Sequence, residues 1–128
     1  MFKIVPIQDK SRQKAVCDLV NATYREDCFA YEMIDNETED LMAMSQFEIL
    51  GKNGIIYDIK SVSTLNDYEA MFILGRQTMN FIDICGAHFC TASIGAGEEK
   101  LLHAIGFRKK DDGVLFVDMS GMFDGKCR

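Results

Sequence analysis

Short runs in which apolar and polar residues alternate dominate the first half of the chain. Alternation with a period of two places one face of a strand against a core and the other toward solvent. Four runs of this kind predict β-strands, at residues 2–7, 29–34, 41–50 and 55–62. The segment Gly51-Lys-Asn-Gly54 predicts a hairpin turn, because Asn-Gly readily adopts positive φ values. Asp9 can cap a helix that reaches about Val20.

A helical spacing of apolar residues replaces this alternation in the second half. It predicts a long helix from about Tyr68 to Ile84. Its expected apolar stripe consists of Ala70, Ile73, Leu74, Phe81 and Ile84. A strand at 87–94, a short helix at 98–105 and a hairpin formed by 108–110 and 114–119 follow. A helix between two strands is typical of a parallel crossover inside a mixed sheet.

Composition narrows the classes of protein and partner. The 128 residues suit one domain spanning 1–128, and the apolar content of 48% supports a packed core. The net charge of −6 and the lack of a basic patch argue against a nucleic-acid partner. No segment predicts a signal peptide or a membrane-spanning helix, so we expect a cytoplasmic protein with no membrane partner. Five cysteines without a Cys-x-x-Cys pair indicate reduced thiols, and Cys127 is expected to be exposed.

Two segments of the second half carry a family resemblance. Residues 69–86 resemble the central helix of the GNAT acyltransferase superfamily. Residues 101–107, Leu-Leu-His-Ala-Ile-Gly-Phe, resemble its closing "Leu-Tyr-x-x-x-Gly-Phe" signature. The order of elements matches over nearly the whole chain. The resemblance therefore implies an α/β fold of the mixed α+β kind: a GNAT-like, mostly antiparallel sheet of about seven strands, with a long central helix and flanking helices.

The resemblance also implies where acetyl-CoA or CoA would bind. In that family, a glycine-rich loop and the N-terminus of the central helix hold the cofactor's pyrophosphate. The residues at corresponding positions are Val62, Leu65, Asn66, Asp67, Tyr68, Glu69 and Ala70. This stretch contains no glycine and no basic residue, and Asp67 and Glu69 place carboxylates where the phosphates would lie. A carboxylate at a helix N-terminus stabilises the empty helix and repels an anion.

The expected acid–base residues depart from the family pattern as well. Leu102 stands where many members carry a tyrosine that protonates the leaving thiolate. His103 is the neighbouring candidate, although one helical step turns a side chain by about 100°. Asp58 is the candidate general base on the fourth strand.

Other constellations have simpler explanations. Cys85, His88 and Cys90 lack further ligands at zinc spacing, so we expect no metal site. His88 and Cys90 share a strand face and could form a nucleophile pair, but no orienting group is identifiable. The glycines in 94–98 predict a flexible strand-to-helix turn rather than a phosphate loop.

Three functional hypotheses follow. The first is a divergent GNAT-fold protein with a degenerate pyrophosphate loop, which binds a small ligand or a protein partner without ordinary acetyl transfer. The second is an active acyl-CoA-dependent N-acetyltransferase that acts on a small amine or a protein. The third is a structural module that forms a homodimer through the apolar surface of the long helix. Whether the chain is an enzyme stays open between them.

Overall fold

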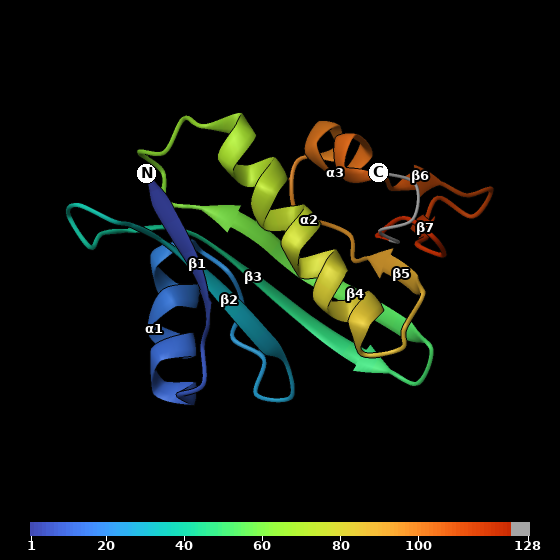
Figure 1. The fold of residues 1–128 in the computed structure, drawn as a ribbon, viewed down its shortest axis with the longest axis horizontal. Helices are drawn as coiled ribbons and strands as arrows, with labels where there is room; N and C mark the ends of the chain where they lie inside the picture. The colour runs from blue at the N-terminus through green and yellow to red at the C-terminus, as the bar shows by residue number, and fades with distance from the viewer. Residues whose placement is uncertain (124–128) are drawn as a thin grey trace.

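The computed structural model describes residues 1–123, and Cys127 lies outside this range. Its elements, in chain order, are β1 (Phe2–Pro6), α1 (Lys10–Leu19), β2 (Phe29–Asp35), β3 (Leu41–Leu50), β4 (Asn53–Ser61), α2 (Tyr68–Ile84), β5 (Phe89–Ala92), α3 (Glu99–Ile105), β6 (Arg108–Lys109) and β7 (Leu115–Asp118). This order confirms the predicted mixed fold (Figure 1).

The strands form one seven-stranded sheet in the order β1-β2-β3-β4-β5-β7-β6. The first four pair as an antiparallel meander, and β7 pairs antiparallel with both β5 and β6. The β4–β5 pair is parallel, with α2 as the crossover. The sheet is therefore mostly antiparallel with one parallel step, as the sequence predicts.

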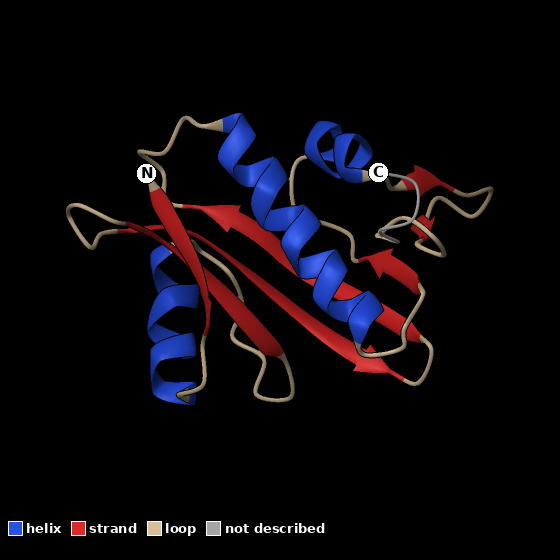
Figure 2. Cartoon of the chain, viewed as in Figure 1, coloured by secondary structure: helices blue, strands red, loops and turns tan. Residues whose placement is uncertain are grey.

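The helices cover the two faces of the sheet unequally. Ala43 and Phe47 of β3 belong to the main core cluster, which contains the buried residues of α2 and α3. Met44 points to the opposite face and packs with Val16 and Cys17 of α1 in a smaller cluster. Figure 2 shows α2 running across the sheet and α3 beside it. Side chains that alternate along β3 therefore contribute to two separate hydrophobic clusters, one on each face of the sheet.

Local signals explain where the helices begin and end. The Asp9 side chain accepts a hydrogen bond from Ser11 N–H, and Asp67 accepts one from Ala70 N–H, so a carboxylate caps both α1 and α2. Gly106 ends α3 with a φ of 132°. Phe107 follows it and is fully buried, which anchors the helix end.

The predicted apolar stripe of α2 is partly wrong. Ala70 and Leu74 are buried as expected, but Ile73 and Ile84 are 40% and 72% exposed. Gly75, Thr78, Met79 and Ile82 are buried in their place. Apolar residues surround most of this helix, so its sequence does not single out one face. Packing against β3 selects it, and Thr78 Oγ1 lies 2.8 Å from Ser45 Oγ of that strand.

None of the helices within residues 1–123 combines the length and apolar content that a bilayer span requires.

Candidate functional site

The two halves of β4 have different neighbours. Residues Asn53–Ile56 pair in parallel with Phe89–Ala92 of β5. The ladder ends where Ser93 N–H donates to the Ile56 carbonyl oxygen at 2.9 Å. Beyond that point β4 continues to Ser61, still paired with β3 but no longer with β5. The second half of β4 therefore has an edge that β5 does not cover.

A bulge marks the change between the two halves. Gln46 of β3 pairs with Asp58, but the next residue, Phe47, pairs with Ile56. Tyr57 is thus the extra residue of β4. Tyr57 and Asp58 consequently both bond to side chains on the α1 side, Tyr57 to Glu48 and Asp58 to Gln46.

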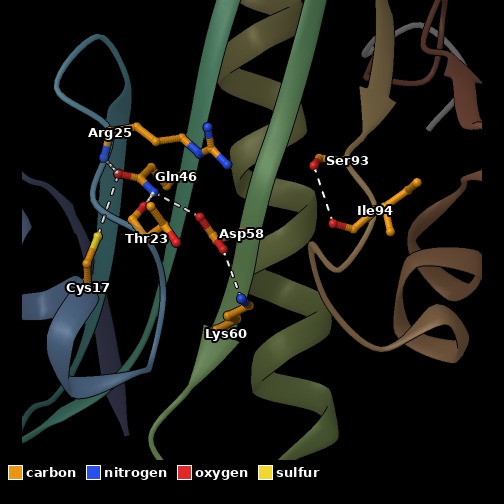
Figure 3. Close-up of polar contacts among 8 residues, drawn as sticks. All are labelled: Cys17, Thr23, Arg25, Gln46, Asp58, Lys60, Ser93 and Ile94. Atoms are coloured by element: carbon orange, nitrogen blue, oxygen red, sulfur yellow. Dashed lines mark hydrogen bonds and ion pairs between the residues drawn. The ribbon is translucent and has the colours of Figure 1, made fainter.

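The segment Ser93–Gly97, called the strap below, covers the open edge. Figure 2 shows it within the loop that leads from β5 to α3, and Figure 3 shows Ser93 and Ile94 across from Asp58 and Lys60. Ile59 N–H of β4 donates to the Ala96 carbonyl oxygen of the strap at 2.7 Å. A Cβ added to Gly97 would lie 2.9 Å from the Ile59 carbonyl oxygen, so a glycine allows this close approach.

A cavity of about 470 Å³ opens beside the strap, at the C-terminal end of β4. Its lining residues come from the ends of α1, β4, α2 and α3, the loop before α2 and the strap: Val20, Ile59, Lys60, Ser61, Leu65, Asn66, Asp67, Tyr68, Met71, Gly95, Gly97, Glu98 and Leu101. The size is within the range of small-molecule sites. The lining combines aliphatic side chains with two carboxylates and one lysine.

The predicted cofactor residues divide between this cavity and other surroundings. Leu65, Asn66, Asp67 and Tyr68 line it, whereas Val62, Glu69 and Ala70 do not. Val62 packs against the α1-side cluster, Glu69 is exposed and Ala70 is buried in the main core.

Asp67 itself occupies the N-terminus of α2. Its Oδ1 accepts the Ala70 N–H at 3.0 Å, and its carbonyl oxygen accepts the Met71 N–H at 3.2 Å. Glu98 contributes a second carboxylate to the lining, from the residue that precedes α3. The end of the cavity where a bound anion would meet α2 therefore already carries negative charge.

Asp58, the predicted general base, is buried beside Lys60, which lines this cavity. It is only 4% exposed and is not among the lining residues. Its Oδ2 accepts a hydrogen bond from Gln46 Nε2 at 2.8 Å, and its Oδ1 lies 3.1 Å from Lys60 Nζ (Figure 3). Both carboxylate oxygens are thus engaged within the protein.

Gln46 is the centre of a buried network that sequence reasoning missed. Its Oε1 accepts hydrogen bonds from Gln13 Nε2 at 2.9 Å and from Arg25 N–H at 3.0 Å, with the Cys17 thiol 3.6 Å away. Its Nε2 donates to the Thr23 carbonyl oxygen as well as to Asp58. Gln13 and Gln46 are fully buried. A glutamine within an alternating strand carries no sequence signal for such a role.

Burial and the nearby Asp58 carboxylate raise the pKa of the Cys17 thiol to about 11. Burial removes the solvation that a thiolate needs, and the carboxylate adds repulsion. Cys17 therefore remains a neutral thiol that contributes to packing and weak hydrogen bonding at ordinary pH.

The predicted acid on α3, His103, does not line the cavity either. Leu102 is buried in the main core, and His103 is exposed and does not line the cavity. The His103 carbonyl oxygen accepts a hydrogen bond from Arg108 Nη1 at 2.8 Å. One helical step therefore places Leu102 in the core and His103 in solvent.

His88 pairs with a different residue from the one the sequence suggests. Its Nδ1 lies 2.6 Å from Asp83 Oδ1 at the end of α2. Cys90 is fully buried, and burial raises its thiol pKa to about 12, so it does not supply a thiolate at ordinary pH. Within residues 1–123, no group of three or more potential metal ligands is close enough to hold an ion.

Comparisons with known proteins bear on the fold. No protein-family model and no curated protein matches the chain. Solved structures match nearly its full length at low identity. The ribosomal-protein-S18-alanine N-acetyltransferase of Escherichia coli has a TM-score of 0.69 at 11% identity, over 93% of this chain and 94% of that one.

Two further structures give the same result. An N-acetyltransferase from Staphylococcus aureus has a TM-score of 0.68 at 18% identity, covering 94% and 99% of the two chains. An N-acetyltransferase from Thermoplasma acidophilum, solved in complex with coenzyme A, has a TM-score of 0.69 at 8% identity, covering 92% and 99%. The chain has the GNAT fold.

Proposed function

We propose that this chain is a divergent GNAT-fold protein that binds a small ligand or a protein partner without ordinary acetyl transfer. The main observation behind the proposal is the hydrogen bond that Ile59 N–H donates to the strap. Through this bond the strap occupies the edge of β4 that β5 leaves free. The closed N-terminus of α2 supports it independently.

The residues at the α2 end of the cavity do not fit a pyrophosphate. A bound anion would replace Asp67 as the partner of Ala70 N–H and would lie near Glu98 as well. Lys60 is the single cationic side chain in the lining, and its ammonium group already neutralises Asp58. Two carboxylates against one committed lysine leave the site repulsive to phosphate.

The edge of β4 does not fit an extended, amide-bearing cofactor arm either. Such an arm would need main-chain groups of the strand as hydrogen-bond partners. The Ile59 N–H is bonded to Ala96, and Gly97 lies against the Ile59 carbonyl oxygen. A second cavity, of about 410 Å³, lies beyond the strap and shares Gly95 and Gly97 with the first. The strap therefore stands between two cavities that a long cofactor would have to join.

The ligand class follows from the lining. Leu65, Met71 and Leu101 offer an apolar surface, while Asp67 and Glu98 favour a neutral or positively charged polar group. A volume of about 470 Å³ accommodates a molecule far smaller than CoA. We expect a small amine or a neutral polar molecule, or the side chain of a partner protein.

Acyl-CoA-dependent N-acetyltransferase activity is the second candidate, and the fold favours it. The three matched structures named above are N-acetyltransferases, and one of those three is a complex with coenzyme A. The cavity also lies at the N-terminus of α2, where the resemblance implies a cofactor. Catalysis would then rest on positioning and on main-chain amides, because Asp58 is engaged and His103 is remote.

Thermal unfolding with acetyl-CoA or CoA separates the two candidates. A ligand that binds only the folded state at a hundredfold excess over its dissociation constant adds about 2.7 kcal/mol of stability. We expect no change in Tm at millimolar cofactor. A Tm that rises with cofactor concentration would reject the proposal in favour of the enzyme.

A series of gain-of-function variants tests which segment prevents CoA from binding. The triple change Leu65→Arg, Asp67→Gly and Glu69→Gly gives the α2 loop a cation and two glycines. If the loop alone excludes CoA, this variant binds it. We expect binding to require Gly97→Ala in addition, because the strap would still cover β4. CoA binding by the triple variant alone would contradict this role of the strap.

A homodimer through α2 remains the third candidate. Ile73 and Ile84 on its outer surface are exposed and apolar, which favours self-association. Gel filtration measures it directly, and the mass of a monomer would remove this candidate.

A further inference from the structure

A separate cavity lies where β1 leads into α1, at the start of β2 and beside the C-terminal half of α2. Its volume is about 340 Å³. Its lining residues are mostly apolar or aromatic: Pro6, Ile7, Gln8, Lys10, Cys28, Phe29, Ala30, Tyr31, Phe47 and Phe81. It shares no residue with the cavity beside the strap. We call it the aromatic cavity.

Four aromatic rings from three elements form its walls. Phe29, Tyr31 and Phe47 lie on one face of β2 and β3, with Tyr31 stacked on Phe47 at a centroid distance of 5.8 Å. Phe81 of α2 meets each of the other three rings edge-on, at 5.8 to 6.0 Å. Rings at these distances and angles support one another, so the walls are held before any ligand arrives.

One of these rings remains largely in water. Phe29 is 52% exposed, whereas Phe47 beside it is 1% exposed. A flat apolar molecule in the cavity would cover the exposed part of Phe29 and extend the stack. The free energy of that burial is available to a ligand because the folded chain alone does not use it.

Lys10 is the one charged side chain that residues 1–123 contribute to the lining of the aromatic cavity, beside the uncharged polar side chains of Gln8 and Tyr31. Lys10 Nζ donates to the Cys28 carbonyl oxygen at 2.6 Å and to Gln13 Oε1 at 3.1 Å. An ammonium group has three N–H donors, so one remains for a ligand. No lining residue is an aspartate or glutamate, and none of the ion pairs within residues 1–123 involves Lys10.

We propose that the aromatic cavity binds a small aromatic carboxylate, whose ring stacks against Phe29 and whose carboxylate pairs with Lys10. The uncompensated ammonium group selects an anion over an aromatic amine. The ring walls select a planar molecule over an aliphatic one of the same size. This site is independent of the function proposed for the cavity beside the strap, because the two share no residue.

Three probes of similar shape test each part of the proposal. 3-Phenylpropionate carries both features, 3-phenylpropionamide keeps the ring without the charge, and 3-cyclohexylpropionate keeps the charge without the aromatic ring. Titrations followed by amide chemical shifts of the isotope-labelled protein give both the affinity and the location. We expect 3-phenylpropionate to bind about tenfold more tightly than either analogue, with the largest shifts at residues 28–31.

Two exposed residues supply the variants, and each has a matched control. Lys10→Met should weaken 3-phenylpropionate about tenfold, whereas Lys14→Met, the same change on the next turn of α1, should leave it unchanged. Phe29→Ala should weaken it about fivefold or more. Leu50→Ala removes a side chain with the same exposure, 53%, outside the cavity lining, and should have no effect.

The two variants should also change selectivity in different ways. Lys10→Met should abolish the preference for the acid over the amide, and Phe29→Ala should reduce the preference for phenyl over cyclohexyl. Equal affinity of the native protein for all three probes, no binding at millimolar concentration, or shifts centred on the cavity beside the strap would overturn the proposal.

Discussion

The two halves of β4 have different hydrogen-bond partners along the same edge of the strand. In the first half, Asn53–Ile56, β5 supplies a regular parallel ladder, and Cys90 and Ala92 of β5 are buried. In the second half, the strap supplies a main-chain acceptor from a loop, and a cavity opens beside it. Both halves contribute to the core, Ile56 in the first and Ile59 in the second, but a loop segment that contains two glycines covers the edge of the second half.

This difference lies in the loop that follows β5 rather than in the sheet itself. In this chain β4 and β5 pair only along Asn53–Ile56 and Phe89–Ala92. What covers the remaining edge is set by side chains and loops, which vary independently of the sheet. Two polar arrangements, the Gln46 network and the Asp67 cap, hold the surroundings of the second half in place.

The largest effect is expected at the buried network behind the second half of β4. Gln46→Leu leaves Arg25 N–H, the Thr23 carbonyl oxygen and an Asp58 oxygen without the partner that the buried Gln46 side chain supplies. The loss should lower the free energy of unfolding by about 3 kcal/mol or more. Urea denaturation followed by circular dichroism measures it. The same substitution at exposed Gln77 of α2 is the control, and equal effects of the two would show that the network stabilises nothing.

The contact between strap and strand should be the next most sensitive. Gly97→Ala places a methyl group against the Ile59 carbonyl oxygen and should displace the strap. We expect amide exchange at Ile59 to accelerate about tenfold, equivalent to roughly 1.4 kcal/mol of local stability. The Ser93 amide, bonded to Ile56 in the first half, is the internal reference and should change little. Unchanged protection at Ile59 would mean that the strap accommodates the methyl group.

The Asp67 cap tests the other border of the cavity. Asp67→Ala removes the acceptor of Ala70 N–H and should lower the free energy of unfolding by about 1 kcal/mol. Asp67→Asn keeps a capping oxygen without the charge and should have a much smaller effect. Asp9→Ala, which removes the equivalent cap of α1, provides the reference for an ordinary helix cap. If Asp67→Asn were as destabilising as Asp67→Ala, the charge rather than the hydrogen bond would be the stabilising feature.

The smallest expected effect compares two thiols, one beside each half of β4. Asp58→Asn should lower the pKa of Cys17 from about 11, since the nearby carboxylate raises it, but leave Cys90 at about 12, where burial is the cause. Carbon-13 shifts of labelled cysteines against pH give both values. An equal change at both thiols would indicate a general loosening of the core.

These thiols also set a direction for stability against pH. Both pKa values are raised above 9.0, so a thiolate forms more easily in the unfolded chain. Their contribution to stability is therefore complete below pH 9, and is lost as pH rises toward 11 for Cys17 and toward 12 for Cys90. Denaturation midpoints measured from pH 8 upward should fall over that window.

Much of the architecture could be predicted because its signals are local. The bounds Tyr68–Ile84 of α2 follow from the helical spacing of apolar residues, and the Gly51–Gly54 turn joins two alternating strands. The buried face of α2 could not be predicted, because the exposed residues Ile73 and Ile84 are as apolar as the buried Ile82. Strand β5 is also shorter than the 87–94 predicted, since Ser93 and Ile94 have strand-like sequence but leave the ladder.

The candidate site divides in the same way. That Asp67 lies at the start of α2 could be predicted, because the start of a helix depends on residues that are neighbours in sequence. The surroundings of the Asp58 and His103 side chains could not be predicted. Each depends on which face of its strand or helix packs against the rest of the molecule.

The sequence by itself determined the order of the elements, the Asp9 cap of α1 and the absence of glycine and basic residues from 62 to 70, all of which depend on residues within a few positions of one another. Only the tertiary structure decided that the strap bonds to Ile59, that Gln46 joins α1 to β4, and that four distant rings form one cavity. These contacts join residues far apart along the chain. Their geometry depends on how the helices and loops pack against the sheet, which no local pattern records.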